Sequence, residues 1–105
     1  MAFPPKREHK ISLDAAAALT RRYRERAPKG MQVGTMFPRE VFEALLAQPG
    51  CAGIRAYTGT ADDDSQQTVL VGADGDGNDM TAGLLFDASF PCPPYCGGGN
   101  SLNGQ

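Results

Sequence analysis

The sequence predicts an α+β domain, with two N-terminal helices packed on a small antiparallel three-stranded meander. Apolar residues recur at helical spacing before residue 50, and β-rich runs follow from residue 53. Asp-Gly and Gly-Asn pairs, typical of tight turns, separate the last two runs. We expect a flexible arm over 1–10, a single α+β domain over 11–97 and a loop-like tail over 98–105.

The first helix is predicted over residues 13–26. Ser12 suits the N-cap position, and Pro28 follows where the helix should already have ended. Ala16, Leu19 and Tyr23 recur at three- and four-residue spacing. We expect these three side chains to form the buried face of the helix.

The second helix is predicted to begin near Pro38, because proline at the first helical position loses no needed hydrogen bond. It should end before Pro49. Its expected apolar face consists of Val41, Phe42, Leu45 and Leu46.

Three strands should follow, over residues 53–57, 68–73 and 79–86. The second run is rich in β-branched residues and reads most simply as the hairpin partner of the first. Residues 74–78 form the sharpest turn signal. Everything from Asp87 onward, including the Pro- and Gly-rich end, is expected to be loop-like.

The predicted core is thin. Of 105 residues, 26 are large and apolar and another 14 are alanines. Burying a large side chain contributes roughly 1.5–3 kcal/mol, whereas ordering each residue costs on the order of 1–2 kcal/mol. A homo-oligomer, or a larger protein that covers one face, is therefore the expected kind of partner.

Charge is divided unevenly along the chain. Residues 1–30 carry eight basic and three acidic side chains, whereas residues 31–105 carry two basic and nine acidic ones. The candidate anion-binding residues are Arg21, Arg22 and Arg24 on the first helix. A solvated helix surface explains them at least as simply, so the sequence favours protein over nucleic acid as the partner.

Neither a membrane segment nor a secretory signal is expected. The longest apolar run, residues 15–19, is far shorter than the ~20 residues that span a bilayer. The first ten residues hold prolines and charges in place of an apolar signal core. Three cysteines, an odd number, fit a reducing compartment, so we expect a cytoplasmic protein.

The cysteines are the main chemical candidates. Cys92 and Cys96 flank a Pro-Pro-Tyr segment, and Cys51 is the third thiol. We consider three roles for them: structural or buried thiols, a metal site for zinc or an iron–sulfur cluster, and a redox-active or disulfide-bonded pair. A meander would hold Cys51 away from the pair, so a metal site needs either a tail that doubles back or a second chain.

Other site patterns are incomplete. Asp74, Asp76 and Asn78 begin like a calcium loop, but Asp79 replaces the glycine expected at the sixth position. A hairpin turn is the preferred interpretation. The lone His9 lies in the arm, and no serine or glycine pattern fits a nucleophile elbow or a nucleotide loop. We therefore expect a protein without enzymatic activity and without a bound cofactor.

Four ordered blocks carry a resemblance: ISLDAAAALTRRYRE, QPGCAGIRAY, VLVGADGDGND and PCPPYCG. In this order they resemble a family of small bacterial proteins of unassigned role. The likeness extends from Ile11 to Asn103. It implies a bacterial single-domain protein, and it carries no functional residues to transfer.

Three hypotheses follow. The first is a small non-enzymatic domain that acts through protein contact, as a homo-oligomer or as an accessory to a larger partner. The second is a metal-binding protein centred on Cys92 and Cys96, completed by Cys51 or a second chain. The third is an anion or nucleic-acid binder that uses the basic first helix.

Overall fold

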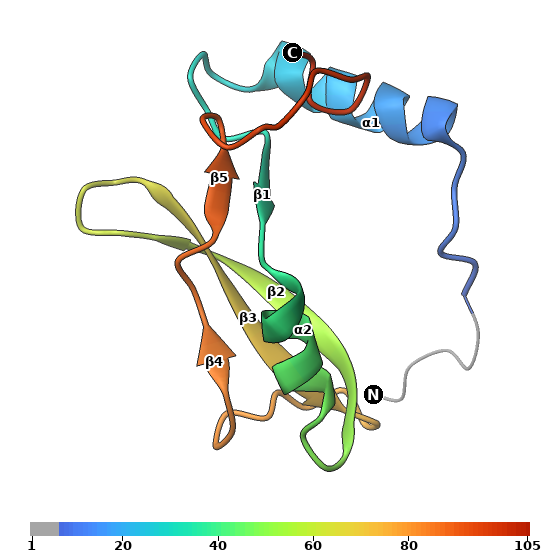
Figure 1. Cartoon of the computed structure of the whole chain (residues 1–105), viewed down its shortest axis with the longest axis vertical. Coiled ribbons are helices and arrows are strands. Elements are labelled where there is room, and N and C mark those ends of the chain that lie inside the picture. The colour runs from blue at the N-terminus through green and yellow to red at the C-terminus, as the bar shows by residue number, and fades with distance from the viewer. Residues whose placement is uncertain (1–6) are drawn as a thin grey trace. The chain divides into compact units, whose positions relative to one another are not determined.

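The computed structural model describes residues 7–105, so residues 1–6 of the expected arm lie outside the described part. These residues form two helices, an antiparallel sheet of three strands and a second sheet of two (Figure 1). The predicted α+β class is confirmed. The chain divides into two compact units, one made of Phe37–Ser89 and one of residues 7–36 with Phe90–Gln105.

The first unit contains helix α2 (Arg39–Leu46) and strands β2 (Cys51–Thr60), β3 (Gln66–Asp74) and β4 (Leu85–Phe86). The strand order is β2-β3-β4, and all pairs are antiparallel. β2 and β3 form a long hairpin that is regular from Gly53 to Thr60, with a bulge between Cys51 and Gly53 (Figure 1). The three-stranded sheet expected from the sequence is therefore present.

The strand lengths differ from the predicted ones. β2 and β3 extend beyond 53–57 and 68–73 at both ends. The third strand was expected over 79–86, but only Leu85 and Phe86 form β4, and Asp79 makes an isolated bridge to Ala73. Between them the backbone turns at Gly83, whose N–H donates to the Met80 carbonyl at 3.0 Å. This turn interrupts the predicted strand.

The core of the first unit lies where α2 contacts β2 and β3. Leu45 is completely buried, and Leu70 and Val71 of β3 are nearly so. The predicted apolar face of α2 is right for Leu45 but wrong for Phe42 and Leu46, which are exposed. An eight-residue helix over a small sheet has room to bury only its central row of side chains.

Pro38 is the N-cap of α2, one position before its predicted place at the start of the helix. Its backbone is extended, and its carbonyl accepts a hydrogen bond from the Val41 N–H at 3.1 Å. The prediction thus located the beginning of this helix to within one residue.

The second unit contains helix α1 (Leu13–Arg26) and strands β1 (Gly34–Met36) and β5 (Phe90–Cys92). The predicted bounds of α1 are confirmed, and the Ser12 hydroxyl accepts a hydrogen bond from the Ala15 N–H at 3.1 Å. β1 and β5 pair antiparallel, so that Met36 lies opposite Phe90 and Gly34 opposite Cys92 (Figure 1). This ribbon replaces the loops expected in both places.

The predicted buried face of α1 is wrong. No residue of α1 is buried, and Leu19 and Tyr23 are exposed. The four consecutive alanines at residues 15–18 offer little apolar area, and the Tyr23 hydroxyl donates a hydrogen bond to the Gln32 carbonyl. Packing of α1 on the three-stranded sheet stays a prediction, as does the single domain over 11–97.

Candidate functional site

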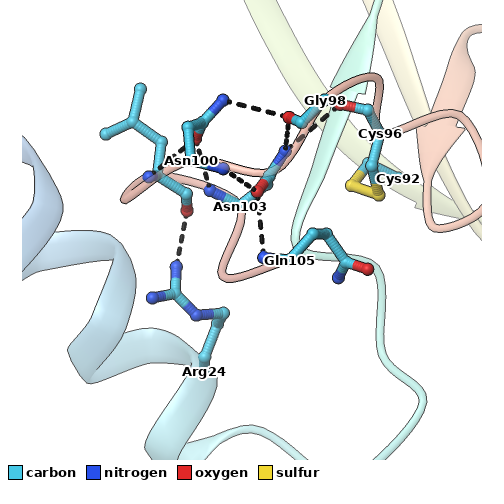
Figure 2. Close-up of a disulfide and its surroundings, with 8 residues drawn as sticks. Arg24, Cys92, Cys96, Gly98, Asn100, Asn103 and Gln105 are labelled. Atoms are coloured by element: carbon cyan, nitrogen blue, oxygen red, sulfur yellow. Dashed lines mark hydrogen bonds between the residues drawn. A yellow bond between two sulfur atoms is a disulfide. The ribbon is translucent and has the colours of Figure 1, made fainter.

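A disulfide joins Cys92, the last residue of β5, to Cys96 four residues later (Figure 2). Cys92 is buried and Cys96 half-buried, while the Pro-Pro-Tyr segment between them is exposed. The peptide bonds that precede Pro93 and Pro94 are both cis. Of the three roles considered for these cysteines, the structure contains the disulfide.

Cys51 is a free, half-buried thiol in the first unit. Its Sγ atom donates to the Gly53 carbonyl at 3.2 Å. Within residues 7–105 no three His, Cys, Asp or Glu side chains gather as a metal site would require. Because metals bind the thiolate form, a zinc or iron–sulfur site that uses Cys92 and Cys96 can apply only to the reduced protein.

The chain after the disulfide forms neither helix nor strand, as its composition predicts, and hydrogen bonds hold it in a turn. The Asn103 amide donates to the carbonyls of Cys96 and Gly98 at 3.2 and 3.1 Å (Figure 2). The Asn100 side-chain oxygen accepts from the N–H groups of Leu102 and Asn103. Asparagine spaced in this way forms Asx turns, which is the signal that could have predicted this turn.

The candidate anion-binding arginines do not share one environment. Arg21 and Arg22 are exposed on α1, whereas Arg24 is half-buried. The Arg24 guanidinium donates to the Leu102 carbonyl at 2.5 Å and so ties the helix to the C-terminal turn (Figure 2). One of the three predicted residues therefore has a structural contact of its own.

A pocket of about 380 Å³ opens at the C-terminal end of α1. Its lining includes the basic side chains Arg24 and Lys29, the acidic Glu25 and the apolar Met31 and Val33. Lys29 was not a predicted site residue, because it lies beyond the helix and belongs to no motif. The lining therefore holds two cationic side chains and one carboxylate, which leaves one net positive charge for a small anion.

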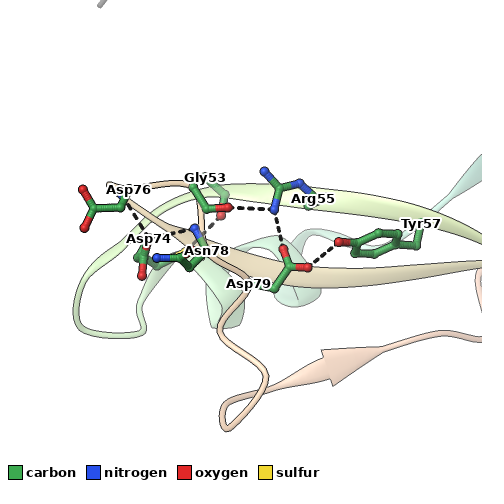
Figure 3. Close-up of polar contacts among 9 residues, drawn as sticks. Gly53, Arg55, Tyr57, Asp74, Asp76, Asn78 and Asp79 are labelled. Carbon is green, nitrogen blue, oxygen red and sulfur yellow. Dashed lines mark hydrogen bonds and ion pairs between the residues drawn. The ribbon is translucent and has the colours of Figure 1, made fainter. Parts of the chain in front are cut away.

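A second polar cluster lies on the hairpin of the first unit, where Arg55 and Tyr57 project from the same face of β2 (Figure 3). The Arg55 guanidinium pairs with the Asp79 carboxylate at 2.5 Å and donates to the Gly77 carbonyl at 2.9 Å. The Tyr57 hydroxyl donates to the other oxygen of Asp79. Both charged side chains are partly exposed, at 32% and 22%.

These contacts change the proton affinities of the cluster. Hydrogen bonds from Tyr57 and Arg55, with the positive charge of Arg55, lower the pKa of Asp79. The same hydrogen bond to the Asp79 carboxylate raises the pKa of Tyr57, and the pairing raises the pKa of Arg55. This cluster was not predicted from the sequence. The alternation of Arg55 and Tyr57 was its only local signal.

The turn over residues 74–78 is confirmed. One Asp74 side-chain oxygen accepts from the N–H groups of Asp76 and Asn78, at 3.0 and 2.9 Å (Figure 3). Gly77 supplies the positive φ, at 85°. With Asp74 holding the backbone and Asp79 held by Arg55, these carboxylates stabilise the turn.

No helix in the described part of the chain is both long and apolar enough to cross a membrane. Comparison with known proteins finds no match to a family model, to a curated protein or to a solved structure. The resemblance to small bacterial proteins therefore stays a prediction.

Proposed function

We propose that this chain is a small non-enzymatic bacterial domain that acts through protein contact, as a homo-oligomer or as an accessory to a larger partner. The supporting observation is its apolar surface. Among the described residues, fourteen large apolar side chains are exposed, whereas only five apolar residues are buried. These side chains leave apolar surface on both units that another protein can cover, as contiguous apolar patches do at protein interfaces.

The charge distribution supports the same proposal. The unit over Phe37–Ser89 holds two basic and nine acidic side chains, and residues 7–36 with 90–105 hold seven basic and three acidic ones. Two units of opposite charge offer complementary surfaces for a partner or for a second copy.

The test replaces exposed apolar side chains without touching the core. Leu19→Ser and Tyr23→Ser on α1, and Leu46→Ser on α2, change side chains that are 56%, 45% and 53% exposed. We expect at least one to weaken capture of a defined partner, or self-association measured by light scattering, while the circular dichroism stays unchanged. A compact monomer that captures no partner, and that behaves the same in all variants, would refute the proposal.

Anion binding through the second unit is the second candidate, favoured by the exposed Arg21 and Arg22 and by the pocket with Arg24 and Lys29. Phosphate groups of a nucleic acid or a small anion are the expected ligands. Binding should fall steeply with salt, because each neutralised phosphate releases condensed counterions.

The anion candidate is tested with a fluorescent single-stranded oligonucleotide and with inorganic polyphosphate. The double variant Arg21→Glu/Arg22→Glu should abolish binding, and Arg39→Glu, an exposed arginine on the acidic unit, serves as the control. Binding that does not change between low and high salt would eliminate this candidate.

A cytoplasmic location is also proposed, from the odd number of cysteines. The Cys92–Cys96 disulfide makes it testable, because disulfides are rare in reducing compartments. Acid quenching of cells, alkylation of thiols in denaturant and mass spectrometry should find all three cysteines modified. Modification of Cys51 alone would place the protein in an oxidising compartment.

A further inference from the structure

β2 is an edge strand of unusual length for so small a sheet. It has ten residues, and β3 is the only strand that pairs with it in the described part of the chain. A long open edge presents a row of backbone donors and acceptors, which can template pairing with another strand. The kind of strand that can pair with this edge depends on which of its backbone groups face outward.

The hydrogen bonds on the far side of β3 identify the outward groups. The Met80 N–H donates to the Gly72 carbonyl at 2.8 Å, and the Asp74 N–H donates to the Asn78 carbonyl at 3.0 Å. Even-numbered residues of β3 therefore direct their backbone groups away from β2. Because these directions alternate along a strand, odd-numbered residues of β3 face β2.

The register of the hairpin carries this alternation across to β2. Val71 lies opposite Arg55 and Val69 opposite Tyr57, so the odd-numbered residues of β2 bond to β3. The Ala61 N–H, which donates to the Ser65 carbonyl at 2.9 Å, continues the same alternation. The outward N–H and C=O groups belong to Ile54, Ala56, Thr58 and Thr60.

This edge carries almost none of the features that discourage pairing. Residues 53–60 contain no proline, lysine or carboxylate, and the only bulge lies before Gly53. Arg55 is the single charge, and Asp79 already pairs with it. Ala56 and Thr58 are both exposed, so neither side chain is covered by the fold.

We propose that β2 pairs antiparallel with β2 of a second copy of this chain, about a two-fold axis through Ala56. This inference rests on the proposed contact function and names its partner and surface. In this register Ile54 lies opposite Thr58 of the partner subunit. Arg55 lies opposite the partner's Tyr57, a cation and an aromatic ring that attract each other.

The strand sequence favours this register over its neighbours. A two-fold axis through Arg55 would place the two arginines directly opposite each other, which is destabilising. An axis through Tyr57 would leave Arg55 opposite a glycine of the partner. The axis through Ala56 pairs the regular residues 53–59 with their copies and places a β-branched side chain on each side of the alanine pair.

A second copy is the best occupant because such an edge complements itself, and a two-fold axis closes the assembly at a dimer. In this dimer the acidic units of the two copies repel each other, because each unit holds two basic and nine acidic side chains. Added salt should therefore tighten this dimer. A contact between the acidic unit of one copy and the basic unit of another would instead loosen as salt rises.

The test is the molar mass of the whole chain by light scattering and sedimentation over a concentration series. Thr58→Pro removes an outward N–H and no hydrogen bond of the hairpin, a position where edge strands tolerate proline. Thr58→Val keeps the N–H and the branched shape. We expect the wild type and Thr58→Val to form the same dimer. The proline variant should dimerise with an affinity at least about tenfold lower than that of the wild type, which corresponds to about 1.4 kcal/mol.

A folded proline variant that dimerises like the wild type would overturn the edge pairing and leave the contact function intact. A wild type that stays monomeric at every concentration would also overturn it, and capture of another protein would then decide the contact function separately. A dimer that weakens with salt would overturn it in favour of contact between opposite charges.

Hydrogen exchange keeps the test decisive if the proline variant fails to fold. In the wild type, the amides of Ile54, Ala56 and Thr58 should exchange more slowly as the protein concentration rises, because pairing protects them. The amides of Arg55 and Tyr57, already bonded within the hairpin, serve as internal controls. Outward amides that exchange at the same rate at every concentration would refute the proposal.

Discussion

At the residue scale, neighbouring side chains with similar chemistry have very different roles. Leu45 is completely buried, whereas Leu46 is 53% exposed on the same helix. Arg24 is bonded to the C-terminal turn, whereas Arg21 and Arg22 face solvent. The periodicity of the sequence located the helices correctly, but burial of each side chain depended on what the helix packs against.

The two leucines provide a matched pair for a stability test. Leu45→Ala should lower the free energy of unfolding by about 2–5 kcal/mol, because it removes a buried side chain and leaves a cavity. Leu46→Ala should change it by less than about 0.5 kcal/mol. Urea unfolding followed by circular dichroism measures both. Equal losses in the two variants would contradict the assigned core.

The cluster of Arg55, Tyr57 and Asp79 should make part of the folding stability sensitive to acid. Since folding lowers the pKa of Asp79 from 3.8, the cluster contributes stability above that pKa and loses it as the pH falls through the lowered value. The raised pKa of Tyr57 has the opposite effect on the pH dependence. The stability that it contributes is present below pH 10.0 and is lost as the pH rises through and beyond 10.0.

Midpoints of urea unfolding measured from pH 7 down to pH 2 test this contribution to stability. Asp79→Asn should lower the midpoint at pH 7 and reduce the loss of stability in acid. Asp87→Asn, which changes an exposed carboxylate, is the control. A wild type and an Asp79→Asn variant with parallel pH profiles would show that the cluster makes no contribution.

At the element scale, the β1–β5 ribbon is the least predictable part of the fold. Each strand has three residues, too few for a period-2 pattern to be recognised, and 53 residues lie between the two strands in the chain. The Val33 N–H donates to the Cys92 carbonyl at 2.8 Å and extends the ribbon, and the disulfide fixes the chain directly after β5.

Reduction of the disulfide should loosen this ribbon. The closed loop is short, so the chain-entropy model gives about 2 kcal/mol of stabilisation. We expect the reduced protein to unfold at lower urea and to exchange the Val33 amide faster. The double variant Cys92→Ser/Cys96→Ser should match the reduced protein and no longer respond to reductant. A response that persists in this variant would point to Cys51 instead.

At the scale of the whole molecule, the division of charge along the chain coincides with the division into two units. The boundary near residue 36 separates the basic first third from the acidic remainder, and the returning segment, Phe90–Gln105, carries no charged side chain. The net charge of −2 is therefore the small difference between two units that carry large charges of opposite sign.

This arrangement predicts that edge-paired dimers associate further with one another near the isoelectric point of about 5.2, where the net charge vanishes but each unit keeps its own sign. Light scattering at low ionic strength should peak there. Salt at about 0.5 M should suppress the peak, because it screens contacts between opposite charges. A peak that persists in salt would indicate association through apolar surface or strand pairing.

The sequence by itself determined the α+β class, the bounds of α1 with its Ser12 cap, the turn over 74–78 and the separation of charge. All of these depend on residues close together in the chain. Only the tertiary structure decided which cysteines are bonded, that β1 pairs with β5, that Asp79 meets Arg55 and Tyr57, and which leucine is buried. These features depend on contacts between distant segments, and the energy of such contacts leaves no local pattern.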